Sequence, residues 1–313
     1  MNIENNKVLE IISGSHLYGT ATPASDKDLI GIFIGDELIY FGLEIVEEAD
    51  LSIKDKTENN KNTKDAIDRK FYEIRRFVKL ACQNNPSFIE ILFVNKENIL
   101  FVNSFGRQLL DSKHLFPCKG AAHRFMNYAI SQKHKMYIKR DNIIVLRRAF
   151  DFFQREITNQ ATANKLLAEY RGINLEFITF YTNNCTIGDL SFSLKVKIKD
   201  VAGKIQNRID KFTNRVSIID SMGFDGKFGS HLIRLMLEGL ELLETGNIEF
   251  PLKDRNLLTD IKNGKYTLKE VVKISEELEK QITYAETISK LPDKPQYDEI
   301  NSLLIKIIKT YLF

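Results

Sequence analysis

The sequence predicts an α+β protein, with strands and helices in its N-terminal part and mainly helices in its C-terminal part. The isoleucine-rich run from Leu29 to Ile34 lies between turn-forming residues, so we predict that it is a buried strand. A shorter apolar segment, from Val8 to Ile12, enters a tight turn, as a strand or the end of a helix does. Beyond about Phe101, apolar residues recur at helical spacing. We therefore expect one domain at residues 1–104 and a mainly helical domain at residues 105–313.

An amphipathic helix is predicted after Asp68, because apolar residues recur at helical spacing from Ile74 to Ala81. The segment Asn84-Asn85-Pro86 ends this pattern, since proline cannot continue a helix. Residues 87–94 are apolar around Glu90, and their periodicity leaves both a helix and a strand open. The polar, asparagine-rich residues 54–64 are expected to form an exposed loop.

Further helices are predicted in the C-terminal part by the same spacing of apolar residues. They are expected at residues 121–137, 144–157, 163–170, 228–244 and 268–288. The segment from Ser191 to Ile198 instead alternates apolar and polar residues, as a strand does. An extended or hairpin insertion is therefore expected near residues 185–200.

Composition excludes several classes of protein. The chain of 313 residues has 45 basic and 42 acidic residues, so its net charge of +3 does not by itself indicate nucleic-acid binding. The three cysteines Cys82, Cys118 and Cys185 lack CxxC spacing, which argues against a disulfide framework and a thiolate zinc site. No apolar run approaches the roughly 18–20 residues of a membrane span, and the polar start lacks the order of a signal peptide. We therefore expect a cytoplasmic protein without a membrane partner.

Two aspartates carry the strongest chemical signal. Asp26 and Asp28 are separated by one residue and lead into the apolar run that begins at Leu29. If the strand begins there, both carboxylates leave the same face and converge. Such convergence is repulsive unless divalent cations neutralise it, and carboxylate oxygens favour hard ions. The pair therefore predicts a site for Mg²⁺ or Mn²⁺, where two ions could activate an attacking oxygen and stabilise a leaving group.

A glycine-serine turn precedes these aspartates. Gly14 and Ser15 stand about a dozen residues upstream of Asp26. Such a turn, where it opens a helix, offers backbone N–H groups and a hydroxyl to a polyphosphate. By themselves the two residues would indicate an ordinary turn with a helix cap, but beside the aspartates they favour phosphate binding.

The string from Gly14 to Gly31, GSHLYGTATPASDKDLIG, resembles the signature of polymerase β-like nucleotidyltransferases, and more closely the RNA repair pathway DNA polymerase beta family. Further segments that look like family motifs are Tyr18-Gly19-Thr20, Asp68 to Phe77, Asn85-Pro86 with Glu90, Lys227-x-x-x-His231-x-x-Arg234-Leu235, Glu241 to Gly246 and Phe250-Pro251-Leu252. The resemblance therefore covers most of the chain.

This resemblance implies a mixed sheet flanked by helices, divalent metal at the aspartates, and a nucleoside triphosphate such as ATP as the nucleotide donor. It also implies nucleotide-binding roles for matching residues, namely Gly14, Ser15, Tyr18, Ser25, Lys227, His231 and Arg234. The family's name points to RNA ends as acceptors. His16 stands where such sequences often carry a basic residue, and the segment 136–220 is longer than the family leads us to expect.

A third carboxylate is expected from a neighbouring strand, and the candidates are Asp65, Asp68 and Glu73. Asp68 is preferred because it follows a short apolar step and matches the family's placement, although an aspartate there could simply cap the next helix. On that helix, Arg75 could flank the cleft or belong to a solvated face.

Basic residues in the C-terminal part have two interpretations each. His231 and Arg234 are three residues apart on a predicted helix, with Lys227 one turn earlier, so they could contact a base or phosphate or anchor neighbouring helices. A second basic stretch could bind single-stranded RNA or form a solvated helix end. It comprises Lys133, His134, Lys135, Lys139 and Arg140, with Tyr128 and Tyr137 interleaved.

The sequence therefore predicts a metal-dependent nucleotidyltransferase with Asp26, Asp28 and Asp68 as catalytic and metal-binding residues. It would move a nucleoside monophosphate from an NTP to an acceptor hydroxyl, at an RNA end or alternatively on a small molecule or protein. A non-catalytic nucleotide- or RNA-binding module is a third alternative, which the intact aspartate pair disfavours. The acceptor, the preferred nucleotide and the oligomeric state stay open at this stage.

Overall fold

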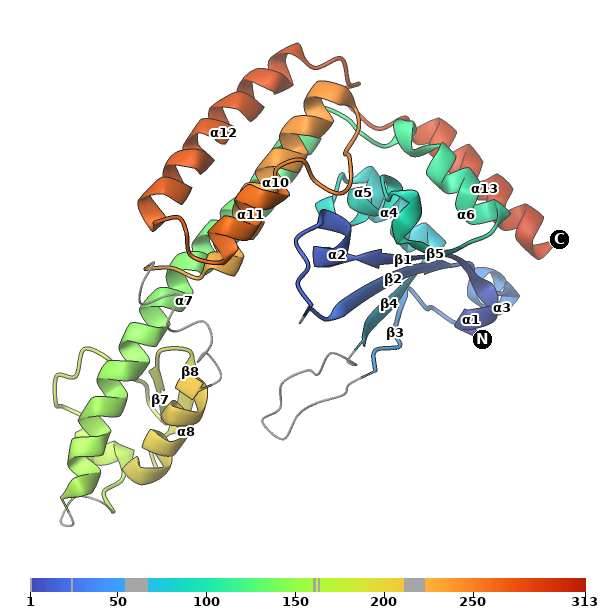
Figure 1. Ribbon diagram of the computed structural model, residues 1–313. Coiled ribbons are helices and arrows are strands. Elements are labelled where there is room, and N and C mark those ends of the chain that lie inside the picture. Colours follow the sequence, from blue (N-terminus) through green and yellow to red (C-terminus); the bar gives the residue numbers. More distant parts are fainter. Residues whose placement is uncertain (1, 24, 54–66, 160–161, 163, 211–222) are drawn as a thin grey trace. The chain divides into compact units, whose positions relative to one another are not determined.

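The computed structural model describes residues 2–23, 25–53, 67–159, 162, 164–210 and 223–313, without the side chains of residues 137–140 (Figure 1). The chain forms two compact units. Unit 1 comprises residues 1–130, 231–259 and 273–313, and unit 2 comprises residues 131–230 and 260–272. This division differs from the expected boundary between residues 104 and 105, because segments from the end of the chain complete the first unit.

Unit 1 is built on a five-stranded mixed sheet in the order β3-β4-β2-β1-β5 (Figure 1). Its strands are β1 (Lys7–Ser13), β2 (Lys27–Phe33), β3 (Glu48–Asp50), β4 (Ile67–Glu73) and β5 (Ile99–Val102). Strands β2 and β4 are parallel, whereas the other neighbouring pairs are antiparallel. The expected α+β class and the mixed sheet are confirmed.

Helices cover the sheet and complete the core of unit 1. They include α1 (Ile3–Asn6), α2 (Gly14–Tyr18), α3 (Glu37–Phe41), α4 (Ile74–Cys82), α5 (Pro86–Leu92), α6 (Ser104–Asp111) and α13 (Tyr297–Leu312). Parts of α7 (Ala121–Thr158), α10 (Gly226–Thr245), α11 (Arg255–Lys262) and α12 (Leu268–Ile288) also belong to this unit. Tyr72 of β4 meets Phe88 of α5 at 4.8 Å between ring centroids, and Phe88 in turn meets Phe77 of α4 at 5.9 Å. These contacts place α4 and α5 on the face of the sheet from which Tyr72 projects.

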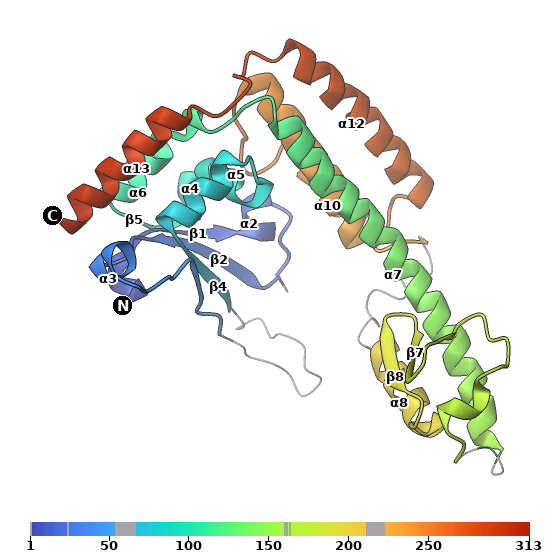
Figure 2. The ribbon, with the colours of Figure 1, turned by 180° about the vertical axis from the view of Figure 1, so that it is seen from behind.

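The C-terminal helix belongs to the same unit as the N-terminal sheet. In both ribbon views α13 runs beside α6 (Figures 1 and 2), and Phe105 of α6 meets Tyr311 of α13 at 5.5 Å between ring centroids. The Tyr311 hydroxyl also donates to the side-chain oxygen of Asn6 at 3.1 Å. Residues from the two ends of the chain therefore pack together within unit 1.

Unit 2 contains part of the long helix α7 together with a small antiparallel sheet. Its elements include α7 (Ala121–Thr158, shared with unit 1), the 3₁₀ turn η3 (Leu167–Tyr170), β6 (Thr179–Phe180), β7 (Asn184–Ile187), β8 (Leu190–Ser193) and α8 (Ile198–Asp210). A buried cluster that includes Leu146 and Phe153 of α7, Phe192 of β8 and Val201 of α8 forms its core. The expected insertion near residues 185–200 is thus the β7–β8 hairpin and the start of α8.

Several elements follow the sequence pattern closely. Helices α4 and α12 (Leu268–Ile288) form where apolar spacing predicted them, as does α10 (Gly226–Thr245). The segment 87–94, which periodicity left open, is largely helical, because the Asn85 side chain caps Ser87 N–H at 3.2 Å and Pro86 occupies the first turn.

Other expectations were wrong in detail. The two helices expected at 121–137 and 144–157 are one helix, α7, since no glycine or proline interrupts the chain between them. The helix expected at 163–170 is only the turn η3, and the strand expected at 191–198 ends at Ser193. The loop expected at residues 54–64 lies outside the described residues. Among the described helices, none combines the length and the apolar character needed to span a bilayer.

Candidate active site

The segment between β1 and β2 begins with a single helical turn, α2. Its first residue, Gly14, has a φ of +63°, and the residue that ends it, Gly19, has a φ of 74°. Both values lie in the left-handed region that favours glycine. A helix of five residues is too short to be stable by itself, so its position depends on contacts with its neighbours.

The Asp28 carboxylate lies directly against the backbone of Gly14. A Cβ atom added to Gly14 would be 2.2 Å from Oδ2 of Asp28, far inside contact distance. Strand pairing explains this approach, because Ser13 is the partner of Asp28 in the β1–β2 ladder and its hydroxyl donates to the Asp28 carbonyl at 3.2 Å. The glycine-serine turn and the second aspartate of the motif are therefore in contact.

Asp68 is the register partner of Asp28 on the neighbouring parallel strand. Residues paired in this way project from the same face of a sheet, so the two carboxylates leave the same side. This is the face that α4 and α5 cover further along β4, through Tyr72. Asp28 is half-buried and Asp68 is exposed, so their oxygens lie where the sheet meets solvent.

Asp26 immediately precedes β2, which begins at Lys27 rather than at Asp26. It is half-buried and follows a local turn. In that turn the Ser25 N–H bonds the Thr22 carbonyl at 2.9 Å, and the Ser25 hydroxyl accepts from the Thr22 N–H at 2.9 Å. Ser25 thus closes the turn that places Asp26 directly before the start of β2.

The other candidates for a third carboxylate differ from Asp68. Glu73 is buried and caps α4, accepting from the N–H groups of Arg75 and Arg76 at 3.0 and 3.3 Å and from the Tyr40 hydroxyl at 2.7 Å. Asp65 lies outside the described residues. Arg75 stacks over the Tyr40 ring at 4.3 Å and bonds Glu73 at 3.2 Å. The residue that caps α4 is therefore Glu73 and not Asp68, for which a capping role was the alternative.

A buried ionic network holds the other end of α2. The Tyr18 hydroxyl donates to Glu90 Oε2 at 2.6 Å, and the Arg234 guanidinium lies over the Tyr18 ring at 4.1 Å. Arg234 Nη1 donates to Glu90 at 2.6 Å and to both oxygens of Glu238 at 2.9 and 2.8 Å. Arg234, Glu90 and Glu238 are 8%, 4% and 0% exposed. We refer to these four residues as the α2 anchor.

Burial and charge act against each other in the α2 anchor. Burial opposes the charged form of Arg234, but Glu238 and Glu90 hold the pKa of its guanidinium well above the ordinary value. Burial also raises the pKa of Glu238 well above its usual range, although Arg234 opposes this shift. Burial raises the pKa of the Tyr18 hydroxyl too, so Tyr18 stays a hydrogen-bond donor to Glu90.

The α2 anchor also joins segments that resemble the family's later motifs. The Leu252 N–H donates to the Tyr18 carbonyl at 3.2 Å, and the Phe250 ring lies 6.1 Å from the Tyr18 ring. A Cβ on Gly19 would be 2.8 Å from Pro251. Segments that are far apart in the sequence therefore meet around one helical turn.

Of these residues, sequence reasoning overlooked Glu238. Its signal was present, because Glu238 is four residues after Arg234 on an apolar helix, the spacing at which opposite charges pair. Two of the nucleotide-binding candidates, Tyr18 and Arg234, belong to the α2 anchor, and their polar groups bond its carboxylates. His231 is half-buried on α10, and Lys227 is exposed in the first turn of that helix.

Removing the cation of the α2 anchor should destabilise the protein. Arg234→Met leaves the Glu90 and Glu238 carboxyl groups buried without a cation, and breaking such a pair costs about 3–5 kcal/mol. Urea unfolding measures the loss. Lys227→Met, on the exposed face of the same helix, is the control and should change the free energy of unfolding by less than about 0.5 kcal/mol. A wild-type value for Arg234→Met would instead favour a substrate contact for Arg234.

The basic stretch predicted for RNA lies on α7. Lys133 is half-buried and Lys135 exposed, and both belong to unit 2. The side chains of Tyr137, Lys139 and Arg140 are outside the described residues. Tyr128 belongs to unit 1, where its hydroxyl accepts from the Asn85 amide at 2.9 Å.

The described side chains do not by themselves form a complete metal centre. Within these residues no three His, Cys, Asp or Glu side chains are gathered closely enough to hold a metal ion. The local chemistry nevertheless fits a divalent cation, because two carboxylates share one face and Asp28 fills the space that a Cβ at Gly14 would need.

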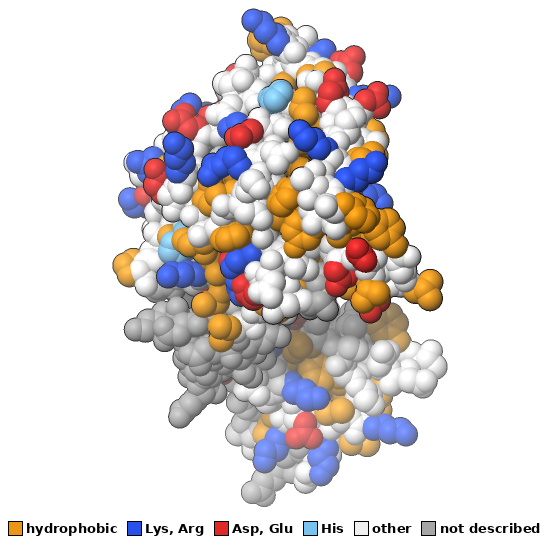
Figure 3. Space-filling view, turned by 90° about the vertical axis from the view of Figure 1, so that its right-hand side faces the viewer, with side chains coloured by type: hydrophobic (Ala, Val, Ile, Leu, Met, Phe, Trp, Pro, Cys, Tyr) orange, Lys and Arg blue, Asp and Glu red, His pale blue; other side chains and the backbone are white. Residues whose placement is uncertain are grey.

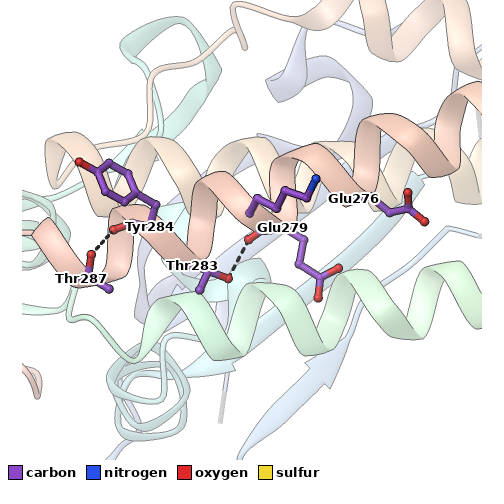
Figure 4. A pocket seen from close by; sticks show the side chains of 6 residues that line it. Glu276, Glu279, Thr283, Tyr284 and Thr287 are labelled. Atoms are coloured by element: carbon purple, nitrogen blue, oxygen red, sulfur yellow. Dashed lines mark hydrogen bonds between the residues drawn. The ribbon is translucent and has the colours of Figure 1, made fainter.

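Two further surface features contain none of the candidate site residues. A pocket along α12 is lined by Glu276, Glu279, Lys280, Thr283, Tyr284 and Thr287, as Figure 4 shows. The hydroxyls of Thr283 and Thr287 donate to carbonyls of their own helix at 2.8 and 2.7 Å, so they do not converge on a ligand. Exposed apolar side chains, among them Phe41 and Phe313, also occur in unit 1. On the face shown in Figure 3, hydrophobic side chains lie between charged ones.

Two known proteins are similar to this chain. An uncharacterized 38.9 kDa protein from the nrdC-mobD intergenic region of enterobacteria phage T4 is 25% identical over 306 residues, covering 90% of this chain and 89% of the phage protein. A nucleotidyltransferase-like protein from Exiguobacterium sibiricum 255-15 matches over 98% of this chain and 73% of its own, at 10% identity. Its TM-score of 0.25 is too low to establish a common fold.

The RNA repair pathway DNA polymerase beta family matches residues 3–161. The match extends over more than half of the chain and includes the Gly14 turn and the three aspartates. The chain therefore belongs to the RNA repair pathway DNA polymerase beta family and is a nucleotidyltransferase.

Proposed function

We propose that this protein transfers a nucleoside monophosphate from an NTP to a hydroxyl group at an RNA end, with Asp26, Asp28 and Asp68 as the catalytic carboxylates. The observation that carries the proposal is the contact of the Asp28 carboxylate with the Gly14 backbone, together with its register pairing with Asp68. A turn suited to phosphate and two carboxylates therefore lie at one end of the central strands β1, β2 and β4. RNA as the acceptor is supported by the family's description.

The proposed reaction replaces a phosphoanhydride bond of the NTP with a phosphate ester bond to the acceptor. The acceptor oxygen forms a bond to the α-phosphorus of the NTP, the bond from that phosphorus to the bridging oxygen breaks, and pyrophosphate leaves with the bonding electrons. Asp68, the exposed member of the register pair, faces the solvent side from which an acceptor can approach. It is therefore suited to accept the hydroxyl proton.

The nucleotide would lie against the turn that begins at Gly14. The backbone N–H groups of that turn and the Ser15 hydroxyl would bind its phosphates. Asp26 and Asp28 would hold divalent cations, which supply charge neutralisation for the triphosphate and the leaving group. The α2 anchor fixes the far end of this turn by a 2.6 Å hydrogen bond from Tyr18 to Glu90.

Radiolabelled NTPs test the proposed function directly. Each of the four is incubated with the protein and Mg²⁺, or with EDTA in place of Mg²⁺, in the presence of RNA, protein or metabolite pools. We expect label to enter RNA only when Mg²⁺ is present. Label that entered protein or small molecules instead of RNA would show that they, and not RNA, are the acceptor. The absence of transfer to all pools would overturn the proposal.

Asp68→Asn should separate chemistry from nucleotide binding. We expect a strong fall in the transfer rate, because the amide cannot accept a proton, while NTP affinity survives because Asp26 and Asp28 are intact. Calorimetric titration measures the affinity, and single-turnover kinetics measures the rate. If instead Asp65→Asn lowers the rate and Asp68→Asn does not, the third carboxylate is Asp65.

A further inference from the structure

Charge is distributed unevenly between the two units, although the chain as a whole is nearly neutral. Unit 2 contains 20 Lys and Arg residues against 12 Asp and Glu, a net charge of +8. Unit 1 contains 25 against 30, a net charge of −5, and together these give the chain's +3. A concentrated excess of cations is the electrostatic signature of polyanion binding.

An exposed tyrosine stands at one end of the small sheet of unit 2. Tyr181 lies in the turn between β6 and β7 and is 51% exposed. The guanidinium of Arg171 donates to the carbonyl of Tyr181 and, at 3.1 Å, to that of Thr182. The Arg171 guanidinium therefore fixes the backbone that carries the Tyr181 ring.

Lysines follow at the same end of the sheet. Asn184 pairs with Ser193 where β7 begins and β8 ends, and the Leu194 N–H bonds the Asn183 carbonyl at 3.4 Å. The chain then alternates, with Leu194 and Ile198 buried and three lysines exposed. Those lysines are Lys195, Lys197 and Lys199.

These lysines are exposed and are not part of the buried core of unit 2. The intervening apolar residues supply the burial, and within the described part of the chain none of the three lysines forms a salt bridge. Exposed like charges repel one another only weakly in water, so these three ammonium groups are available to an anion. An exposed ring beside cations is the combination that stacks a base and pairs its phosphates.

We propose that this surface, defined by Arg171, Tyr181, Lys195, Lys197 and Lys199 and called here the basic hairpin face, binds single-stranded nucleic acid. The lysines contact phosphates, and the Tyr181 ring stacks against a base. That the bound strand is the acceptor in nucleotidyl transfer rests on the proposed function, whereas the binding itself does not.

The test measures binding of the full-length protein to a fluorescein-labelled oligouridylate, without NTP, by anisotropy over a range of salt concentrations. Lys195→Gln, Lys197→Gln and Lys199→Gln are combined in one variant. Because each lost phosphate contact removes about 0.7 from the log-log salt slope of a single strand, we expect the slope to fall by about 2. The control variant combines Lys290→Gln, Lys294→Gln and Lys306→Gln, three exposed lysines of unit 1. It makes the same change in net charge and should keep the wild-type slope.

Tyr181 is tested separately, because stacking is not electrostatic. Tyr181→Ala should weaken binding by about 5-fold or more without changing the salt slope, and Tyr181→Phe, which keeps the ring, should bind like the wild type. Wild-type affinity in both the lysine variant and Tyr181→Ala would overturn the inference, as would an equal loss in the unit 1 control. Normal oligonucleotide binding without any nucleotidyl transfer would support the basic hairpin face and overturn the proposed function alone.

Discussion

Asp28→Asn is expected to abolish nucleotidyl transfer while leaving the fold intact. The substitution removes one charge but nearly preserves the side-chain volume, so the packing against Gly14 survives. Changing residues that only support a metal ligand typically costs about 10–100-fold, so losing a ligand should lower turnover by at least about 100-fold. Turnover at saturating Mg²⁺ and the melting temperature are measured together.

Asp111→Asn is the matched control for this prediction. Asp111 is an exposed aspartate at the end of α6, in the same unit as Asp28. The control makes the same chemical change away from the strand ends that carry Asp28 and Asp68, and it should leave both turnover and melting temperature as in the wild type. Full turnover by Asp28→Asn would remove Asp28 from the proposed catalytic residues.

Gly14→Ala is expected to damage both stability and activity. A side chain at a φ of +63° costs roughly 1–2 kcal/mol, and the new Cβ would also displace the Asp28 carboxylate, whose Oδ2 lies 2.2 Å from its position. Since the displaced carboxylate is the proposed metal ligand, turnover should fall to nearly the level of Asp28→Asn. Urea unfolding and steady-state kinetics measure the two effects separately.

Gly246→Ala is the control that distinguishes the effect of backbone strain from the effect of displacing the Asp28 carboxylate. Gly246 has a similar φ of +70°, but a Cβ there meets only Leu291, at an ordinary 3.6 Å. This variant should lose a similar free energy of unfolding and keep its turnover. If Gly14→Ala proved as active as Gly246→Ala, the contact between Gly14 and Asp28 would have no role in catalysis.

Much of the fold follows from local patterns. The apolar run after Asp28 predicted β2, and helical spacing predicted α4, α10 and α12 with ends close to those observed. Apolar periodicity did not reveal β4, because Ile67 to Glu73 mixes apolar and charged residues on both faces. One of these charged side chains, Arg69, bonds the distant Glu10 at 2.7 Å, and such pairing is not visible in local periodicity.

The composition of the chain concealed the contrast between its units. The whole-chain charge of +3 averages a basic unit 2 with an acidic unit 1. The unit boundaries explain this, because unit 1 collects its residues from three separate stretches of chain. Charge counted along the sequence therefore could not be assigned to a surface before the chain was folded.

The sequence by itself identified the family and predicted the candidate catalytic motif, because both depend on residue types at short, definite spacings between Gly14 and Asp28. Tertiary structure decided which distant residues join them. Parallel pairing of β2 with β4 placed Asp68 beside Asp28, and burial turned Arg234 toward Glu90 and Glu238. The physical reason is that strand register and the neutralisation of buried charge depend on contacts between residues far apart in the chain, which short-range patterns do not encode.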